Sequence, residues 1–194
     1  MSYADRTYWE GRYRDGKEEG DWLQSWAVLA PILEAEIPHE ARLLHLGCGD
    51  SPLAEAMWEA GYHDQLASDF ATAVLARMAR RVAAYPGLRY LAMDARALAL
   101  GDATCDAVID KGTLDAILCA DDPVVVAAQV VGEVYRVLRP GGCFVSISLR
   151  HPGGRQSLLE GPGWRAAPQP IPKQRIIPDL PEELRWNWVY VLRK

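Results

Sequence analysis

The sequence predicts an α/β protein: a mostly parallel sheet of seven strands, with helices on both faces and an antiparallel hairpin at the C-terminal edge. Two observations predict this fold class. Short apolar runs alternate with helical segments along the middle of the chain, and the last two apolar runs have no helix-length segment between them. The 194 residues, of which 49% are hydrophobic, are enough for a sizeable core. We therefore expect a single domain over residues 1–194.

Two helices are expected before the first strand. Asp5 or Thr7 can cap the first helix, and Gly16 can end it. The second helix covers residues 22–36, because apolar side chains recur there every three or four positions on one face. Pro31 lies inside this pattern, so it begins a new turn or kinks the helix.

Strands and helices then alternate, bounded by glycine, proline or acidic residues. The expected strands cover residues 42–46, 65–68, 88–93, 105–109, 143–149, 171–177 and 184–192. The expected helices cover residues 53–60, 71–84 and 123–138, with Ser51 capping the first and Arg139-Pro140-Gly141-Gly142 closing the last. A proline- and glycine-rich stretch extends to about residue 170, and residues 178–183 join the last two strands.

Composition argues against several classes of protein. The net charge of −5 does not provide the basic face that phosphate binding needs, so a nucleic-acid partner is not expected. The four cysteines, at positions 48, 105, 119 and 143, form no CxxC or CxxH pair, so we expect no metal site and reduced thiols in a cytoplasmic protein. No apolar run is long enough to cross a bilayer, so no membrane partner is expected.

Glycine or an acidic residue ends four consecutive strands of the predicted sheet, at Gly47, Asp69, Asp94 and Asp110. Because the carboxyl ends of parallel strands meet at one edge, where ligands bind in such sheets, these residues should lie together. Three carboxylates at one edge repel one another unless each has a hydrogen-bond donor. The pattern therefore predicts a ligand with several hydroxyl and amino donors.

The first strand end begins a loop, Gly47-Cys48-Gly49, that leads into a helix. Glycines allow a ligand to approach the main chain, and the free amides at a helix start attract an anion. A tight strand-to-helix turn alone would also explain these glycines. The dinucleotide fingerprint GxGxxG is not met, because Pro52 stands where the third glycine belongs.

Asp69 and Asp94 are placed to bind an adenosine group. Asp69 lies about twenty residues beyond Gly49, the position from which a carboxylate accepts hydrogen bonds from ribose hydroxyls, although it could instead cap the next helix. Asp94 can accept a hydrogen bond from the adenine amine or be a solvated loop acid. Because the dinucleotide fingerprint fails, S-adenosylmethionine fits these features better than a dinucleotide.

Seven stretches carry a resemblance to a known family: YWEGRY (8–13), DW (21–22), HLGCGDS (45–51), GYHDQLASDF (61–70), MDARAL (93–98), DAVIDKGTLDAI (106–117) and EVYRVLRPGG (133–142). Over about residues 8–150 the chain resembles the class I S-adenosylmethionine-dependent methyltransferases, which have a Rossmann-like fold. It is similar to the group that includes the lysine methyltransferases of translation elongation factor 1-alpha. DKGTLDA is the most specific motif.

The resemblance implies S-adenosylmethionine as cofactor and S-adenosylhomocysteine as product. Aromatic faces would attract the sulfonium cation by about 0.5–2 kcal/mol, although core packing alone would also explain the N-terminal aromatic residues. Asp110 is a candidate catalytic residue that could orient an acceptor amine or take its proton, or it could only hold the loop. The cofactor-binding residues that the resemblance implies are Trp9, Tyr13, Trp22, Gly47, Asp69, Phe70, Asp94, Ala95 and Lys111. Cys48 and Gly49 of the glycine loop and Asp110 at its strand end are further candidates.

We therefore expect an enzyme that transfers a methyl group to a nucleophile, which the resemblance implies to be a protein lysine amine. A small-molecule acceptor is the first alternative, favoured by the short C-terminal part, and a non-catalytic nucleotide-binding module is the second. Within the expected domain, residues 1–40 form a helical aromatic cap and residues 41–150 the cofactor-binding core. Residues 151–194 form an acceptor-side segment and the C-terminal hairpin.

Overall fold

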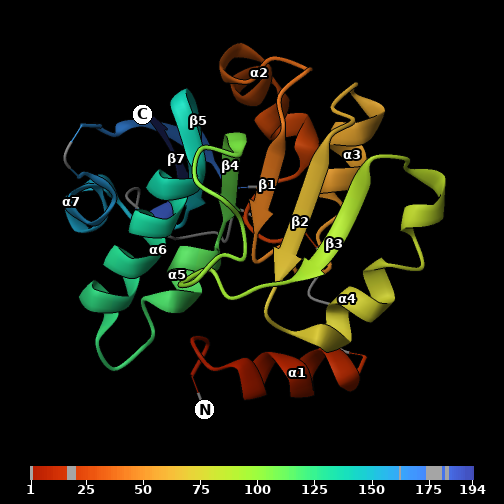
Figure 1. Cartoon of the computed structure of the whole chain (residues 1–194). Helices are drawn as coiled ribbons and strands as arrows, with labels where there is room; N and C mark the ends of the chain where they lie inside the picture. The colour runs from red at the N-terminus through yellow and green to blue at the C-terminus, as the bar shows by residue number, and fades with distance from the viewer. Residues whose placement is uncertain (1, 17–20, 162, 174–180, 182–183) are drawn as a thin grey trace.

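One seven-stranded sheet, in the order β3-β2-β1-β4-β5-β7-β6, forms the centre of the molecule (Figure 1). The computed structural model describes residues 2–16, 21–161, 163–173, 181 and 184–194. Strands β1 to β5 pair in parallel, whereas β7 is antiparallel to both β5 and β6. This confirms the predicted sheet and its antiparallel edge. The strands are β1 (Leu43–Leu46), β2 (Gln65–Asp69), β3 (Leu88–Ala92), β4 (Cys105–Lys111), β5 (Leu138–Ser148), β6 (Ala167–Pro172) and β7 (Trp186–Arg193).

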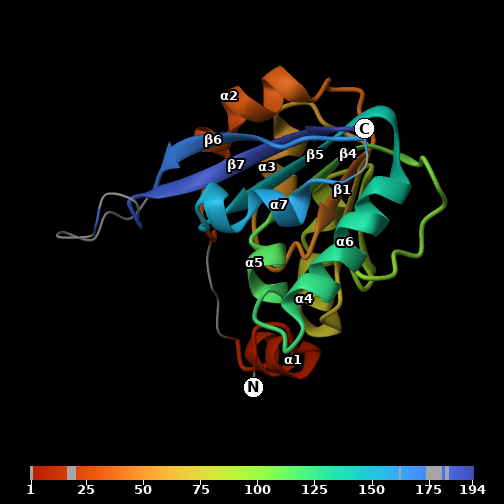
Figure 2. The same ribbon diagram turned by 90° about the vertical axis from the view of Figure 1, so that its left-hand side faces the viewer.

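Helices cover both faces of the sheet (Figure 2). Leu44 of β1 belongs to a buried cluster with Val130 of α6, whereas Leu43 packs with Leu33 of α2 and Met57 of α3. Successive strand residues point to opposite faces, so a strand covered on both sides has a continuous apolar sequence. The helices are α1 (Arg6–Arg14), α2 (Trp26–Glu36), α3 (Leu53–Glu59), α4 (Thr72–Met78), α5 (Thr113–Ile117), α6 (Pro123–Val137) and α7 (Gln156–Leu159), with 3₁₀ turns η1 (Val82–Ala84) and η2 (Pro152–Gly154). None of the helices in the described part of the chain has both the length and the apolar character of a membrane span.

The second helix begins later than predicted. α2 starts at Trp26, and Trp22 lies in the segment before it, next to Leu23 with its positive φ of 65°. The apolar periodicity of residues 22–36 was misleading because Trp22 faces a cavity rather than the helix-covered face of the sheet. Pro31 lies inside α2.

The strand predicted at residues 171–177 is also displaced. β6 covers Ala167–Pro172, and residues 174–177 of the prediction lie outside the described residues. Its prolines, at positions 168, 170 and 172, recur every second residue, so their missing N–H groups all fall on the same side of the strand. An edge strand tolerates this pattern, and β6 is the edge of the sheet.

Helix and strand ends differ from the prediction at three further places. Residues 139–142, which were expected to close the preceding helix, lie within β5, because this strand starts at Leu138. The pairing of β5 with β4 shifts register between Leu138 and Cys143. The C-terminal residue pairs with this part of the strand, since the N–H of Gly141 donates to the carbonyl of Lys194 at 2.8 Å. Ser51 precedes the N-cap of α3, which is Pro52, and its Oγ accepts the N–H of Leu53 at 3.2 Å. The helix predicted at 71–84 is α4 followed by η1.

The first helix lies apart from the two layers that cover the sheet. α1 crosses the carboxyl ends of β1 and β2, opposite α2 at the other end of the molecule (Figure 1). This is the edge at which the sequence places its glycine and acidic strand ends. The N-terminal aromatic residues are therefore brought to the predicted ligand edge.

Candidate functional site

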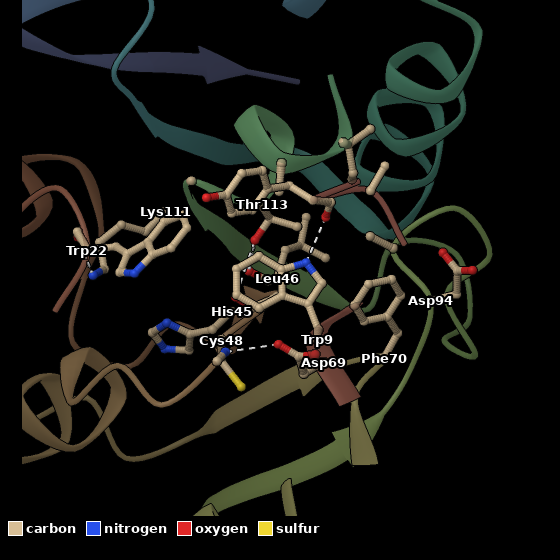
Figure 3. A pocket seen from close by; sticks show the side chains of 18 of the residues that line it. Trp9, Trp22, His45, Leu46, Cys48, Asp69, Phe70, Asp94, Lys111 and Thr113 are labelled. Carbon is tan, nitrogen blue, oxygen red and sulfur yellow. Dashed lines mark hydrogen bonds between the residues drawn. The ribbon is translucent and has the colours of Figure 1, made fainter. Parts of the chain in front are cut away.

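A cavity of about 520 Å³ opens at the carboxyl edge of the sheet, beside α1 and the ends of β1, β2 and β4 (Figure 3). This volume is typical of a small-molecule or cofactor site. All the sequence-predicted cofactor residues except Asp110 line it: Trp9, Tyr13, Trp22, Gly47, Cys48, Gly49, Asp69, Phe70, Asp94, Ala95 and Lys111. Other lining residues were not singled out from the sequence as site residues, among them Tyr3, His45, Asp50, Met93 and Ile117.

The glycine loop after β1 is packed tightly from two sides. Gly47 and Gly49 have φ values of 53° and 52°. A Cβ on Gly47 would lie 2.2 Å from Oγ1 of Thr113, and one on Gly49 would lie 2.7 Å from the hydroxyl of Tyr13. Both positions therefore require glycine, because of the positive φ and because neighbouring side chains fill the space.

Asp69, at the end of β2, fixes the same loop by a hydrogen bond. Its Oδ2 accepts the N–H of Gly49 at 2.9 Å (Figure 3), and its Oδ1 accepts the N–H of Ala71 at 2.8 Å. Burial raises the pKa of Asp69 to about 6, against the opposing effect of these hydrogen bonds. Each carboxylate oxygen accepts more than one hydrogen bond, so a ligand hydroxyl in the cavity can still bind to Asp69.

Asp94 lines the cavity from the loop after β3 and is paired within that loop. Nε of Arg96 lies 2.9 Å from Oδ1, and Nη2 lies 2.5 Å from Oδ2. The hydrogen bonds from Arg96 lower the pKa of Asp94, so this carboxylate is ionised at neutral pH. A ligand amine would share Asp94 with the guanidinium.

Three aromatic rings from the N-terminal region meet at the cavity wall. The ring centroids of Trp9 and Tyr13 are 5.6 Å apart and stacked at 25°, and Trp22 lies 5.6 Å from Trp9. Nε1 of Trp9 donates to the carbonyl of Tyr3 at 2.7 Å, which orients the indole. These rings pack on one another and also line the cavity, so both interpretations of the sequence describe part of their environment.

Glu10 attaches the helix that carries two of these rings. Its Oε1 accepts the N–H of Thr72 at 2.7 Å, and its Oε2 accepts the N–H of Ala73 at 3.1 Å. A carboxylate from α1 thus caps the start of α4 in place of a local side chain. No sequence rule pointed to this contact, because the two helices lie about sixty residues apart.

Lys111 holds the segment before α2 against the cavity. Its ammonium donates to Oδ1 of Asp21 at 2.5 Å and to the carbonyl of Trp22 at 2.7 Å. Burial lowers the pKa of Lys111, and the charge of Asp21 opposes this. Oδ1 of Asp21 also accepts the hydroxyl of Ser51 at 2.8 Å, so one carboxylate joins β4, the glycine loop and the Trp22 segment.

Asp110 lies apart from the other predicted site residues. It is completely buried and does not line the cavity, because side chains alternate along β4 and its neighbours Ile109 and Lys111 face the cavity instead. Oδ1 of Asp110 accepts the N–H groups of Thr113 at 2.9 Å and Leu114 at 3.1 Å. The carboxylate therefore holds the first turn of α5 after Gly112, whose φ is 85°.

The other oxygen of Asp110 belongs to a buried ionic cluster. Oδ2 accepts the hydroxyl of Ser146 at 2.6 Å and lies 3.5 Å from Nη2 of Arg155. Nη1 of Arg155 donates to Oδ1 of Asp115 at 3.1 Å, and Arg155 is only 1% exposed. Burial raises the pKa of Asp110, although Arg155 opposes this. This geometry favours a structural role for Asp110 over proton transfer to a bound acceptor.

A parallel α/β sheet with carboxylates and a glycine loop at one edge defines a Rossmann-like ligand-binding protein. A family profile described as a methyltransferase domain matches residues 44–146, which is more than half of the chain. The chain therefore belongs to the methyltransferase domain family.

Several relatives carry more specific names. The chain is 38% identical over 162 residues to mouse "EEF1A lysine methyltransferase 4", covering 78% of this chain and 64% of that protein. It is 34% identical to mouse "eEF1A lysine and N-terminal methyltransferase", covering 76% of this chain but 22% of that protein. A solved structure with similar fold is the Burkholderia thailandensis 1,6-didemethyltoxoflavin-N1-methyltransferase with bound S-adenosylhomocysteine, at TM-score 0.75, 20% identity and coverage of 97% of this chain and 86% of that one.

Proposed function

We propose that this chain is an enzyme that transfers a methyl group from S-adenosylmethionine to an amine nitrogen. The observation that supports this most is the cavity at the ends of neighbouring strands, which is lined by Asp69, the glycine loop and three aromatic rings. In this proposal Asp69 accepts hydrogen bonds from the ribose hydroxyls, and Asp94 and Phe70 hold the adenine. Trp9, Tyr13 and Trp22 surround the sulfonium.

The cofactor, when bound, supplies an activated methyl group. The residues of this chain position that group and exclude water, which is the main protein contribution to an in-line displacement. The acceptor would be a neutral nitrogen with a free lone pair, and the proton that it loses on methylation would leave to solvent. Asp110 contributes by holding the loop around Gly112 that borders the cavity.

The acceptor we propose is a lysine side chain of a protein, because the mouse relatives are named as lysine methyltransferases of eEF1A. We place the enzyme in the cytoplasm, since all four cysteines are free thiols, as is usual in that reducing compartment. The competing acceptor is a free small molecule. Methyl transfer from labelled S-adenosylmethionine into a cell lysate separates the two, because the label must enter protein if the acceptor is a lysine.

Binding of the cofactor product is the direct test of the proposed function. S-adenosylhomocysteine should bind in calorimetry, and NAD should not. Asp69→Ala should abolish binding, because it removes both the ribose acceptor and the anchor of Gly49. A preference of the wild type for NAD, or unchanged affinity of Asp69→Ala, would refute the proposal.

A further inference from the structure

His45 lines the cavity from β1, although its sequence context gave it no role. It pairs in register with Ile109 of β4, so Lys111, two residues further on, lies on the same face of the sheet. All three line the β1–β4 side of the cavity, whereas Asp69 and Asp94 line the β2–β3 side. The cavity therefore continues past the adenosine end to a second wall.

Gln65 determines which nitrogen of His45 carries the proton. Nε2 of Gln65 lies 2.9 Å from the carbonyl oxygen of Ala54 and 2.7 Å from that of Tyr62. Carbonyl oxygens only accept, so this atom must be the amide nitrogen, and Oε1 must face the imidazole. Nε2 of His45 lies 2.7 Å from Oε1 and therefore donates to it. The proton is on Nε2, and Nδ1 keeps its lone pair.

The imidazole of His45 is a neutral hydrogen-bond acceptor at physiological pH. Burial lowers its pKa to about 4, and the nearby charge of Lys111 acts in the same direction. A ring with this tautomer receives a hydrogen bond at Nδ1 and repels a second acceptor such as a carboxylate. A ligand group placed against His45 must therefore be a donor.

Lys111 has the opposite preference on the same wall. Two of the three N–H donors of its ammonium are used by Asp21 and the carbonyl of Trp22, at 2.5 Å and 2.7 Å. A ligand group placed against Lys111 must be an acceptor, and a negative charge is favoured. A fixed acceptor beside a buried cation matches the two charged groups of an α-amino acid.

We propose that Nδ1 of His45 binds the α-ammonium group of the cofactor's amino-acid end, with Lys111 facing the α-carboxylate. This assignment rests on the proposed function and deepens it. It gives the two ends of the cofactor separate walls: the adenosine lies at β2 and β3, and the amino acid at β1 and β4. His45 is then a specificity residue for an intact amino-acid group.

Two ligands that differ only at this end test the assignment by calorimetry. S-adenosylhomocysteine carries the amino-acid group, whereas 5′-methylthioadenosine retains the adenosine and sulfur without it. His45→Leu should weaken S-adenosylhomocysteine by about ten- to a hundredfold, the range for one hydrogen bond to a charged group, and leave 5′-methylthioadenosine unchanged. His45→Asn, which retains an acceptor oxygen near Nδ1, should recover part of the loss.

Ser68→Ala is the matched control. Its hydroxyl donates to the carbonyl of His45 at 3.0 Å and is equally buried, but Ser68 does not line the cavity. This variant should leave the ratio of the two affinities unchanged. Equal weakening of both ligands by His45→Leu, or no weakening of either, would overturn the role of His45.

A ligand-side measurement on the wild type keeps the test decisive if His45→Leu does not fold. S-adenosylhomocysteine in which hydrogen replaces the α-amine should bind about ten- to a hundredfold more weakly than the parent compound. Equal affinity would overturn the assignment. A wild type that binds none of these ligands would overturn the proposed function together with it, which distinguishes the two failures.

Discussion

Asp69 combines a structural and a proposed binding role in one carboxylate. Its hydrogen bonds to the N–H groups of Gly49 and Ala71 join the end of β2 to the glycine loop and to the start of α4. It is only 5% exposed, and the exposed part faces the cavity. The two interpretations of the sequence, a ribose acceptor and a helix-start residue, are therefore compatible.

The buried position of Asp69 predicts a pH-dependent affinity. Because its pKa is raised to about 6, S-adenosylhomocysteine should bind more tightly as the pH rises from about 5 to 7 and then level off. The free energy of unfolding should change in the opposite direction. The folded state binds the proton of Asp69 more tightly than the unfolded state, in which the pKa is 3.8. The contribution of Asp69 to stability therefore falls as the pH rises from about 4 to 6. Calorimetry across this range checks it. Asp69→Asn, which cannot titrate, should show no such slope, and a flat wild-type profile would contradict the prediction.

Among the elements, α5 depends most on residues outside itself. Five residues are too few for a stable isolated helix. Asp110 holds its first turn, and Asp115 within it binds Arg155 from the segment between η2 and α7. The segment after β5 is thus attached to the loop beside the cavity through a buried ionic cluster. In this cluster, Arg155 is the cation, and Asp110 and Asp115 are its two anionic partners.

Arg155→Met should lower the free energy of unfolding by about 3–5 kcal/mol, because it leaves two buried carboxylates without their cation. Denaturant titration measures this. The matched control is Arg165→Met in the following segment, where the side chain is 84% exposed and pairs with Glu160, and it should change stability by less than about 1 kcal/mol. Similar losses in both variants would contradict the importance of burial here.

Glu10→Ala should detach α1 from α4. The loss of a helix-capping carboxylate costs about 1–2 kcal/mol, so the amides of Thr72 and Ala73 should exchange hydrogen faster, and the affinity for S-adenosylhomocysteine should fall because Trp9 and Tyr13 lie on the same helix. Arg6→Ala is the control, since Arg6 is exposed and pairs with Glu10 at 3.5 Å, and its removal leaves the hydrogen bonds of Glu10 to Thr72 and Ala73 in place. Unchanged exchange in Glu10→Ala would show that other contacts hold α1.

At the scale of the whole molecule, the cavity is a contact between distant parts of the chain. The sheet supplies its floor, α1 and the Trp22 segment supply its wall, and Asp21 and Glu10 attach these N-terminal parts to the core. A ligand that fills the cavity touches all of them. Binding should therefore stabilise the fold as a unit.

A thermal-shift measurement tests this coupling. S-adenosylhomocysteine at a hundred times its dissociation constant adds about 2.7 kcal/mol to the folded state. For a chain of this length that corresponds to a rise of about 5–10 °C in Tm. NAD at the same concentration should give no shift, and a protein that S-adenosylhomocysteine leaves unchanged would contradict the proposed cofactor.

Periodicity and chain order were sufficient to predict the sheet. The alternation of short apolar runs with helices predicts the parallel strands, because each strand is buried on both faces and its sequence shows this locally. The same reasoning was wrong at Trp22, whose side chain lines the cavity instead of packing with the second helix. It was also wrong at β6, whose alternating prolines fit an edge strand paired with a segment that is remote in sequence. An apolar pattern in the sequence indicates which residues are buried, but it does not indicate which part of the chain covers them.

The sequence by itself determined the parallel sheet, the edge at which Asp69 and Asp94 lie, and the glycine loop at the same edge, since strand ends and glycines are local signals. Only the tertiary structure decided which strand-end residues reach the cavity. Asp110 and Lys111 are neighbours, yet one is buried in an ionic cluster and the other lines the cavity, because side chains alternate along β4. The roles of Glu10, Asp21 and His45 depend on contacts across twenty or more residues, and no local pattern contains such contacts.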